Sequence, residues 1–183
     1  MNIIETKSGW PLALRYGLIL AFANIAINLL FYIVNSNPYN SEFSVYSISQ
    51  LALTIVAGFA ILSMAAKMRR DNDLGGVMSY GESLKIMMQT ALPAALIISF
   101  YTYLFFTFIS PEFFTKMWEI QAEQMSQKGM SDEEIEQALR IGSKFNNPLI
   151  MTIFGALGVL FQLFIFSLIA SIFVKKEPKD TDF

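Results

Sequence analysis

The sequence predicts an all-α membrane protein with four transmembrane helices and an amphipathic helical hairpin between the third and the fourth. First, 54% of its 183 residues are hydrophobic and only 15% are charged, whereas a soluble domain usually carries about a quarter charged residues. Second, the charged residues fall in short stretches that separate four long apolar runs, as in helices that cross a bilayer. Third, one long polar segment, residues 110–148, lies between the last two runs. We predict a single membrane domain over residues 1–183, with this segment as an insert.

The composition also limits the chemistry that the chain can perform. It contains no cysteine and no histidine, which excludes disulfides, thiolate and imidazole metal ligands, and the commonest general base near neutral pH. The sequence has no catalytic triad, phosphate-binding glycine loop or metal-binding motif, so we predict no enzyme activity, no metal and no cofactor. The net charge of −2 disfavours a nucleic-acid partner, and the apolar runs make the lipid bilayer the first expected partner.

The first two spans are predicted at about residues 12–34 and 47–66. Span one begins after Trp10-Pro11, because proline loses no needed hydrogen bond in the first helical turn and tryptophan suits the headgroup level. Span two is rich in alanine and glycine, which let helix backbones approach closely in a membrane. It ends in the basic cluster of residues 67–70, KMRR.

The last two spans are predicted at about residues 84–109 and 149–174. Span three is preceded by Ser79-Tyr-Gly-Glu82, which has the S-x-x-E form of a capping box, so the helix is expected to begin before the membrane. Pro93 removes one helical hydrogen bond and is expected to kink this span. Span four is continuous and ends at Lys175-Lys176.

The polar segment of residues 110–148 is predicted to fold as two amphipathic helices. The first begins at Ser110-Pro-Glu112, and the second begins at Ser131-Asp-Glu-Glu134, another S-x-x-E capping box. Apolar residues fall mostly on one face of each helix, and we expect these faces to pack against each other or against the bilayer surface. The candidate docking face consists of Phe113, Phe114, Met117, Trp118, Ile135 and Leu139.

The distribution of basic residues predicts the orientation. All but four of the 13 Lys and Arg residues lie on the side of the two termini and of the connection between spans two and three, and the remaining four lie in residues 110–148. Because positive charge stays cytoplasmic, we predict cytoplasmic termini and an extracytoplasmic hairpin. A candidate cytoplasmic anchor follows, which is an anionic-lipid or partner site or, as we favour, ordinary interfacial anchoring. It comprises Lys67, Arg69, Arg70, Glu82 and Lys85.

Four polar residues are predicted to form an intramembrane polar face, namely Asn24, Asn28, Thr54 and Gln162. Matching depths lead us to expect contacts between Asn24 and Gln162 and between Asn28 and Thr54. We favour structural hydrogen bonds, each contributing roughly 0.6 to 2 kcal/mol, that fix the register of the helices. The alternative is a polar path or pocket for a small solute. We favour the structural interpretation because no ionisable residue lies in the middle of a span, where ion pathways usually have one.

Three stretches of the chain carry a resemblance to a known family. They are residues 75–85 (GGVMSYGESLK), 110–113 (SPEF) and 128–138 (KGMSDEEIEQA). With these stretches the chain resembles the family called domain of unknown function 4199, small four-span bacterial membrane proteins found mainly in Bacteroidetes. The resemblance covers nearly the whole chain and implies an inner-membrane location in a Gram-negative bacterium, with a periplasmic hairpin. It implies no activity and no functional residues.

Two functional hypotheses remain after these exclusions. The leading one is a non-enzymatic protein of the inner (plasma) membrane whose hairpin docks a membrane or periplasmic protein or a second copy of the chain, using its aromatic residues as anchors. The alternative is a small-solute transporter or permeation subunit that uses the polar face inside the bundle and a bent third span. A membrane enzyme is a distant third, because it would need an unrecognised mechanism.

Overall fold

The structure, a computed structural model, describes residues 8–34, 45–143 and 147–177. Within these ranges the chain is helical, apart from short connections and one isolated backbone bridge. The elements in chain order are α1 (Trp10–Val34), α2 (Val45–Asp73), α3 (Tyr80–Leu104), the π-helical turn η1 (Phe105–Ile109), α4 (Phe113–Gln127), α5 (Asp132–Ser143) and α6 (Pro148–Val174).

Four of these helices are long and apolar enough to cross a membrane, namely α1, α2, α3 with its continuation η1, and α6. The predicted fold class, an all-α membrane protein with four such helices, is therefore confirmed, and the chain is a multi-pass membrane protein. α2 runs beyond its predicted end at residue 66, to Asp73, because the Lys and Arg residues that follow are good helix formers.

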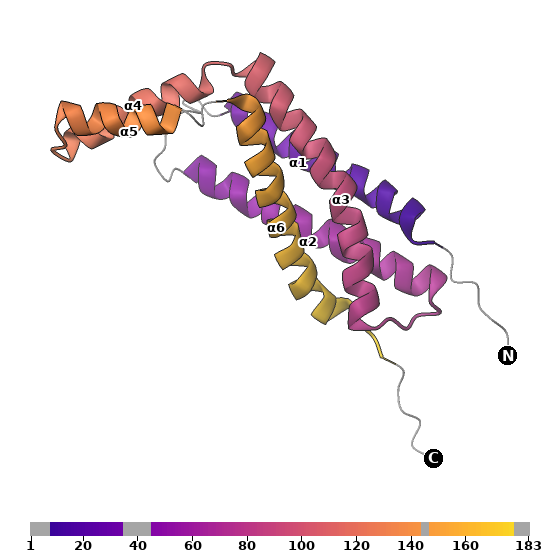
Figure 1. The fold of residues 1–183 in the computed structure, drawn as a ribbon. Helices are drawn as coiled ribbons and strands as arrows, with labels where there is room; N and C mark the ends of the chain where they lie inside the picture. The colour runs from indigo at the N-terminus through magenta and orange to yellow at the C-terminus, as the bar shows by residue number, and fades with distance from the viewer. Residues whose placement is uncertain (1–7, 35–44, 144–146, 178–183) are drawn as a thin grey trace.

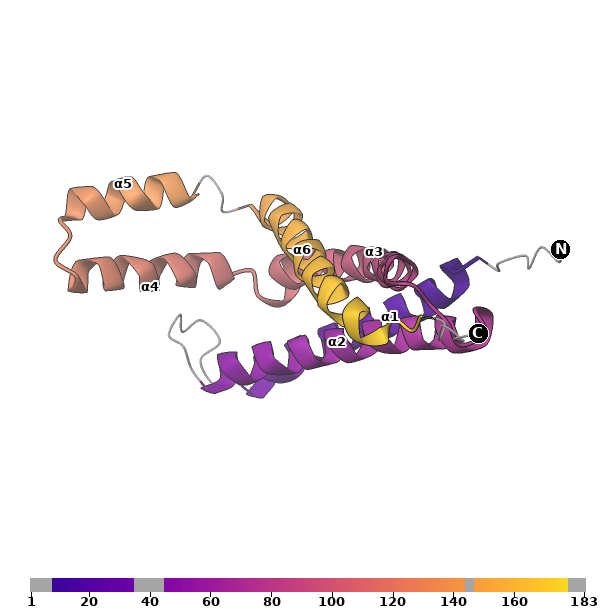
Figure 2. The ribbon, with the colours of Figure 1, turned by 90° about the horizontal axis from the view of Figure 1, so that it is seen from below.

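The bundle has two ends with different neighbours. The terminal end is where α1 begins and α6 ends, and the hairpin end is where α3 ends and α6 begins (Figure 1). α4 and α5 run side by side away from the bundle at the hairpin end, as both views show (Figures 1 and 2). They pack against each other, and the ring of Trp118 in α4 lies directly on Gly142 in α5.

α3 is the central helix of the bundle. It packs against α1 on one side and α6 on the other, and α2 contacts all three (Figure 2). Alanines on α3 allow this close approach, because Ala91, Ala94 and Ala95 are almost completely buried. α1 and α6 are consequently separated from each other by the two helices between them.

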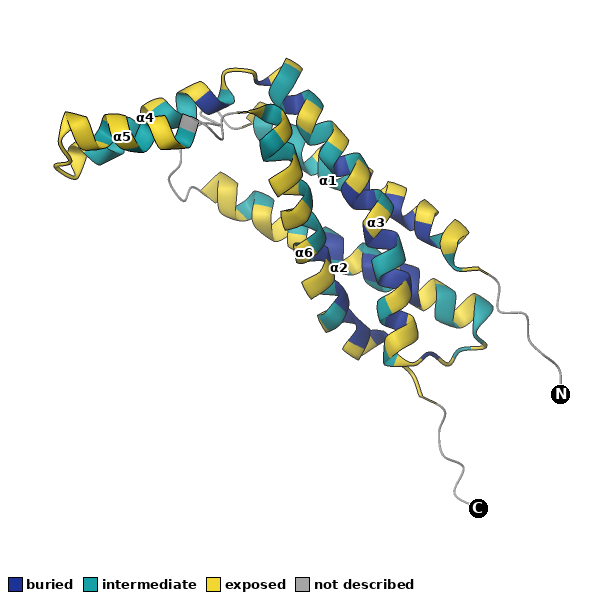
Figure 3. Cartoon of the chain, viewed as in Figure 1, coloured by how far each residue is buried: buried dark blue, intermediate teal, exposed yellow. Residues whose placement is uncertain are grey.

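The buried core lies in the half of the bundle nearer the terminal end (Figure 3). The buried residues of α1 precede Phe22, and those of α6 follow Gln162. Many of them are small, and at Gly17 the backbones approach so closely that an added Cβ would lie 2.7 Å from Pro93 Cγ and 2.9 Å from the Thr90 carbonyl oxygen. Packing of small side chains thus holds this half together.

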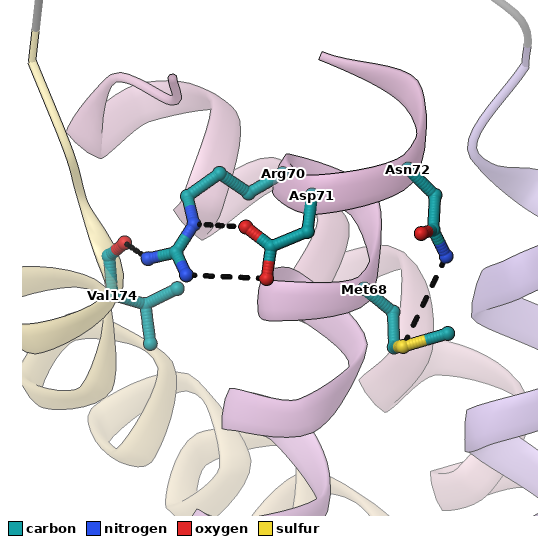
Figure 4. Close-up of polar contacts among 5 residues, drawn as sticks. All are labelled: Met68, Arg70, Asp71, Asn72 and Val174. Carbon is teal, nitrogen blue, oxygen red and sulfur yellow. Dashed lines mark hydrogen bonds and ion pairs between the residues drawn. The ribbon is translucent and has the colours of Figure 1, made fainter. Parts of the chain in front are cut away.

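The terminal end is also closed by hydrogen bonds that we call the clasp. Met78 and Lys176 exchange two backbone hydrogen bonds, with N···O distances of 2.9 and 2.8 Å. The Arg70 guanidinium donates to the Val174 carbonyl oxygen at 3.0 Å and pairs with Asp71 at 2.8 Å (Figure 4). The clasp therefore ties the α2–α3 connection to the end of α6.

Candidate functional site

A cavity of about 290 Å³ opens between α1, α2 and α3 at the hairpin end. We call it the amide–aromatic pocket. Its polar lining residues are Asn28, Ser47, Gln50, Tyr101 and Thr102, and its aromatic lining residues are Phe31, Tyr32, Phe105, Phe106 and Phe113. No charged side chain is among these lining residues, so the pocket offers only neutral hydrogen-bonding groups.

The polar wall of the pocket is ordered by one short hydrogen bond. The Tyr101 hydroxyl donates to Asn28 Oδ1 at 2.6 Å, which fixes the amide and leaves its N–H₂ group as a donor. Thr102 Oγ1 donates to the Ile98 carbonyl oxygen at 2.8 Å and keeps its lone pairs as acceptors. Gln50 on α2 adds a second amide. A ligand with carbonyl or hydroxyl oxygens would therefore find both donors and acceptors here.

The aromatic wall is a series of rings in edge and tilted contact. Phe105 contacts Tyr32 of α1 and Tyr101 of α3, with ring centroids 5.0 and 5.8 Å apart. Phe106 then contacts Phe113 of α4 at 5.1 Å. Phe105 and Phe106 belong to η1, where Ser110 N–H donates to the Phe105 carbonyl oxygen at 2.8 Å, five residues back. Such π-helical turns are frequent at functional sites.

The chain is similar to one known protein family. A family described as "Protein of unknown function (DUF4199)" matches residues 15–176. The chain belongs to the DUF4199 family. The match covers nearly the whole chain, so the resemblance seen in the sequence is confirmed. No curated protein and no solved structure matches this chain.

In this DUF4199 protein the predicted polar face is divided. Asn28 lines the pocket and bonds Tyr101, not Thr54 as predicted. Asn24, Thr54 and Gln162 are half-buried, and the structure shows no hydrogen bond between their side chains and other described residues. The predicted contact between Asn24 and Gln162 is wrong, because α1 and α6 lie on opposite sides of α3.

The predicted docking face of the DUF4199 chain is largely used within the hairpin and its base. Phe113 lines the pocket, and Phe114 is only 5% exposed, with its ring 4.8 Å from that of Phe106. Trp118 packs on Gly142. The other three residues, Met117, Ile135 and Leu139, are half-buried.

The predicted anchor residues of the DUF4199 chain all lie near the terminal end but do different things. Arg70 takes part in the clasp. Arg69, Glu82 and Lys85 line a second cavity of about 340 Å³, and Lys67 is exposed outside it. Glu82 forms the predicted capping box with Ser79.

Ser47 and Gln50 were not identified as pocket residues from the sequence. One signal was present, since Ser47 and Gln50 are three apart at the start of an apolar helix and therefore share a face. Tyr101 follows Phe100 in the aromatic-rich stretch of residues 100–108, which fits an interfacial belt as well as a binding wall and so does not identify a pocket by itself.

Proposed function

We propose that this non-enzymatic membrane protein binds a small uncharged solute in the amide–aromatic pocket, as a transporter or permeation subunit. The observation that carries the proposal is the meeting of Asn28 and Phe113 in one cavity. These residues come from α1 and α4, and they belong to the two regions in which the sequence predicted a function. Convergent polar groups on an aromatic lining are typical of ligand pockets.

The lining defines the class of solute. An ion would leave water without gaining an opposite charge, which is costly in a site with no charged lining residue. A neutral molecule with carbonyl or hydroxyl oxygens and a flat apolar portion gains amide hydrogen bonds and ring contacts instead. The volume of about 290 Å³ corresponds to a small molecule.

The proposal includes a location and an orientation. The basic residues of the sequence support cytoplasmic termini. The resemblance to the family adds the inner (plasma) membrane of a bacterium, with the hairpin in the periplasm. The pocket at the hairpin end would then take its solute from the periplasmic side.

The test is uptake of radiolabelled neutral solutes into proteoliposomes that contain the full-length protein. We expect a subset of solutes to accumulate, and Asn28→Leu to abolish their uptake. Asn24→Leu is the matched control, because Asn24 carries the same amide group and lies one helical turn from Asn28 but does not line the pocket. Uptake that survives Asn28→Leu but not Asn24→Leu would contradict the assignment of the pocket.

Docking by the hairpin remains a second candidate, favoured by the projection of α4 and α5 away from the bundle (Figure 2). Since Phe114 and Trp118 are already packed, the anchors would be exposed residues such as Ile141, which is 56% exposed. The partner would be a membrane or periplasmic protein or a second copy.

This second candidate is tested by crosslinking in native membranes. The intact protein is compared with Ile141→Glu and with a variant in which a short Gly/Ser linker replaces residues 112–145. A defined protein captured by the intact form and lost in both variants would support docking. Capture that is equal in all three would exclude it.

A further inference from the structure

The cavity of about 340 Å³ at the terminal end shares no lining residue with the amide–aromatic pocket. It lies between the start of α1, the end of α2 and the start of α3. Its hydrogen-bonding and charged groups come from Ser8, Arg69, Glu82, Lys85 and Gln89, and its apolar lining includes Trp10 and Ile86. Polar and apolar walls therefore meet in this cavity, and tryptophan is typical of the level where a bilayer changes from headgroup to hydrocarbon.

The charges around this cavity are balanced. Arg69 is 11% exposed and forms an ion pair with Asp73, with a distance of 2.8 Å between Nη1 and Oδ2. Glu82 and Lys85 are both exposed and lie three residues apart, on the same face of α3. One carboxylate and one ammonium group thus face the cavity beside an arginine that already has an acidic partner.

The Glu82 carboxylate is held in place. Its Oε2 accepts hydrogen bonds from Ser79 N–H at 2.9 Å and from the Ser79 hydroxyl at 2.8 Å. The second carboxylate oxygen remains available as an acceptor. A fixed acceptor three residues from a flexible lysine can recognise a ligand that carries both a cation and an anion.

The remaining wall is shaped to admit such a ligand. At Gly9 an added Cβ would lie 3.0 Å from Ile86 Cδ1 and 3.1 Å from Gln89 Oε1, so the bare backbone keeps this part of the cavity open. The exposed ring of Trp10 stands beside it, a position typical of contact with lipid headgroups.

We propose that the cavity binds a zwitterionic phospholipid headgroup that carries a phosphate and a primary ammonium group. Lys85 and the Gln89 amide contact the phosphate, and Glu82 accepts hydrogen bonds from the ammonium. A purely anionic headgroup is disfavoured, because it has no cation of its own to pair with the Glu82 carboxylate, which would repel it. A trimethylammonium headgroup is disfavoured too, because it has no N–H donor for the carboxylate.

The experiment is native mass spectrometry of the full-length protein released from nanodiscs that contain equal amounts of phosphatidylethanolamine, phosphatidylcholine and phosphatidylglycerol. We expect a retained phosphatidylethanolamine adduct. Glu82→Gln should lower its preference over the other two lipids about tenfold, as expected for the loss of one charge-assisted hydrogen bond. The helix start survives this change, because glutamine also completes a capping box.

Two further variants separate the site from the general charge of this end. Lys85→Gln should reduce retention of all three lipids, and Lys67→Gln, an equal charge change outside the cavity, should leave retention unchanged. Thermal unfolding of each variant verifies that it is folded.

Three results would overturn the proposal. Preferred retention of phosphatidylglycerol by the unchanged protein would identify an anionic-lipid site. Equal retention of the three lipids would show only surrounding lipid. Displacement of the adduct by soluble glycerophosphoethanolamine at the same concentration would assign the site to a water-soluble compound in place of a lipid.

Discussion

The two halves of the helix bundle use the same four helices in different ways. In the half nearer the terminal end, which we call the closed half, small residues are buried at the helix contacts, and the clasp closes the end. In the half nearer the hairpin end, which we call the open half, α1 beyond Ala21 and the described part of α6 before Leu163 contain no buried residue. Side-chain size at the contacts therefore decides where these helices touch and where a pocket remains.

The closed half also bears on transport. The amide–aromatic pocket lies at the hairpin end. Between the pocket and the terminal end, the core of α3 is buried against α1 and α6. A solute in the pocket is therefore accessible from the hairpin end and separated from the terminal end by packed side chains. Transport by this protein would require the terminal half to open, whereas solute binding would not.

The largest effect is expected from adding one methyl group at a helix contact in the closed half. Gly17→Ala places a Cβ 2.9 Å from the Thr90 backbone oxygen, so α1 and α3 must separate. We expect a loss of about 1–3 kcal/mol in the free energy of unfolding, typical of overpacking. Gly155→Ala is the control in the open half, where an added Cβ meets no atom within 4 Å. Unfolding in detergent and SDS measures both, and equal losses would contradict the comparison.

A smaller effect is expected from opening the clasp. Arg70→Gln removes the charged donor to the Val174 carbonyl oxygen, and the Arg70 side chain is only 17% exposed. We expect a loss of about 1.5 kcal/mol, at the lower end of the range for a hydrogen bond from a charged group. Lys116→Gln, which removes an exposed ion pair from the hairpin, should cost less in the same assay. The reverse order would show that the clasp does not stabilise the closed half.

The hydrogen bond inside the pocket should contribute still less to stability. Tyr101→Phe removes the donor to Asn28, and we expect a loss of about 0.6 kcal/mol, the average for such bonds between membrane helices. Tyr103→Phe, a change at a residue outside the pocket, should be neutral. If Tyr101→Phe costs as much as Gly17→Ala, the open half depends on polar contacts more than we infer.

The smallest effect is expected at one helix end in the hairpin. Hydrogen bonds from the Ser131 N–H and hydroxyl lower the pKa of Glu134 below its ordinary value of 4.5. The capping box is therefore complete above pH 4.5 and is lost as the pH falls through the lowered pKa. The Ser131 amide proton shift in NMR spectra should titrate with a midpoint below 4.5, and Ser131→Ala should move the Glu134 titration toward 4.5. A midpoint at or above 4.5 in the intact protein would contradict the cap.

Local features of this fold were predictable from the sequence. The four spans follow from composition, and the capping boxes at Ser79 and Ser131 follow from residues three apart in the chain. The choice of helix neighbours was not predictable, because it depends on how small residues on α3 meet α1 and α6. The wrong pairing of Asn24 with Gln162 shows this limit, since equal depth in the membrane does not place two residues side by side.

The candidate site was predictable only in part. Asn28 and Phe113 were identified separately, one as an intramembrane amide and the other as an aromatic anchor. Their meeting depends on η1, and an α-helix and a π-helical turn have no distinct signature in the apolar run FFTFI. The orientation is a prediction from the basic residues, and the membrane of residence is a prediction from the family resemblance.

The π-helical turn η1 has a consequence for the direction of the hairpin. Each residue of an α-helix advances the chain by about 100° around the axis, so one extra residue in a turn rotates everything beyond it by that amount. Phe105–Ile109 therefore sets the azimuth at which α4 and α5 leave the bundle. Deletion of a single residue from this turn would rotate the whole hairpin about the axis of α3 while every span remained in place. The direction of the hairpin can therefore change independently of the membrane fold.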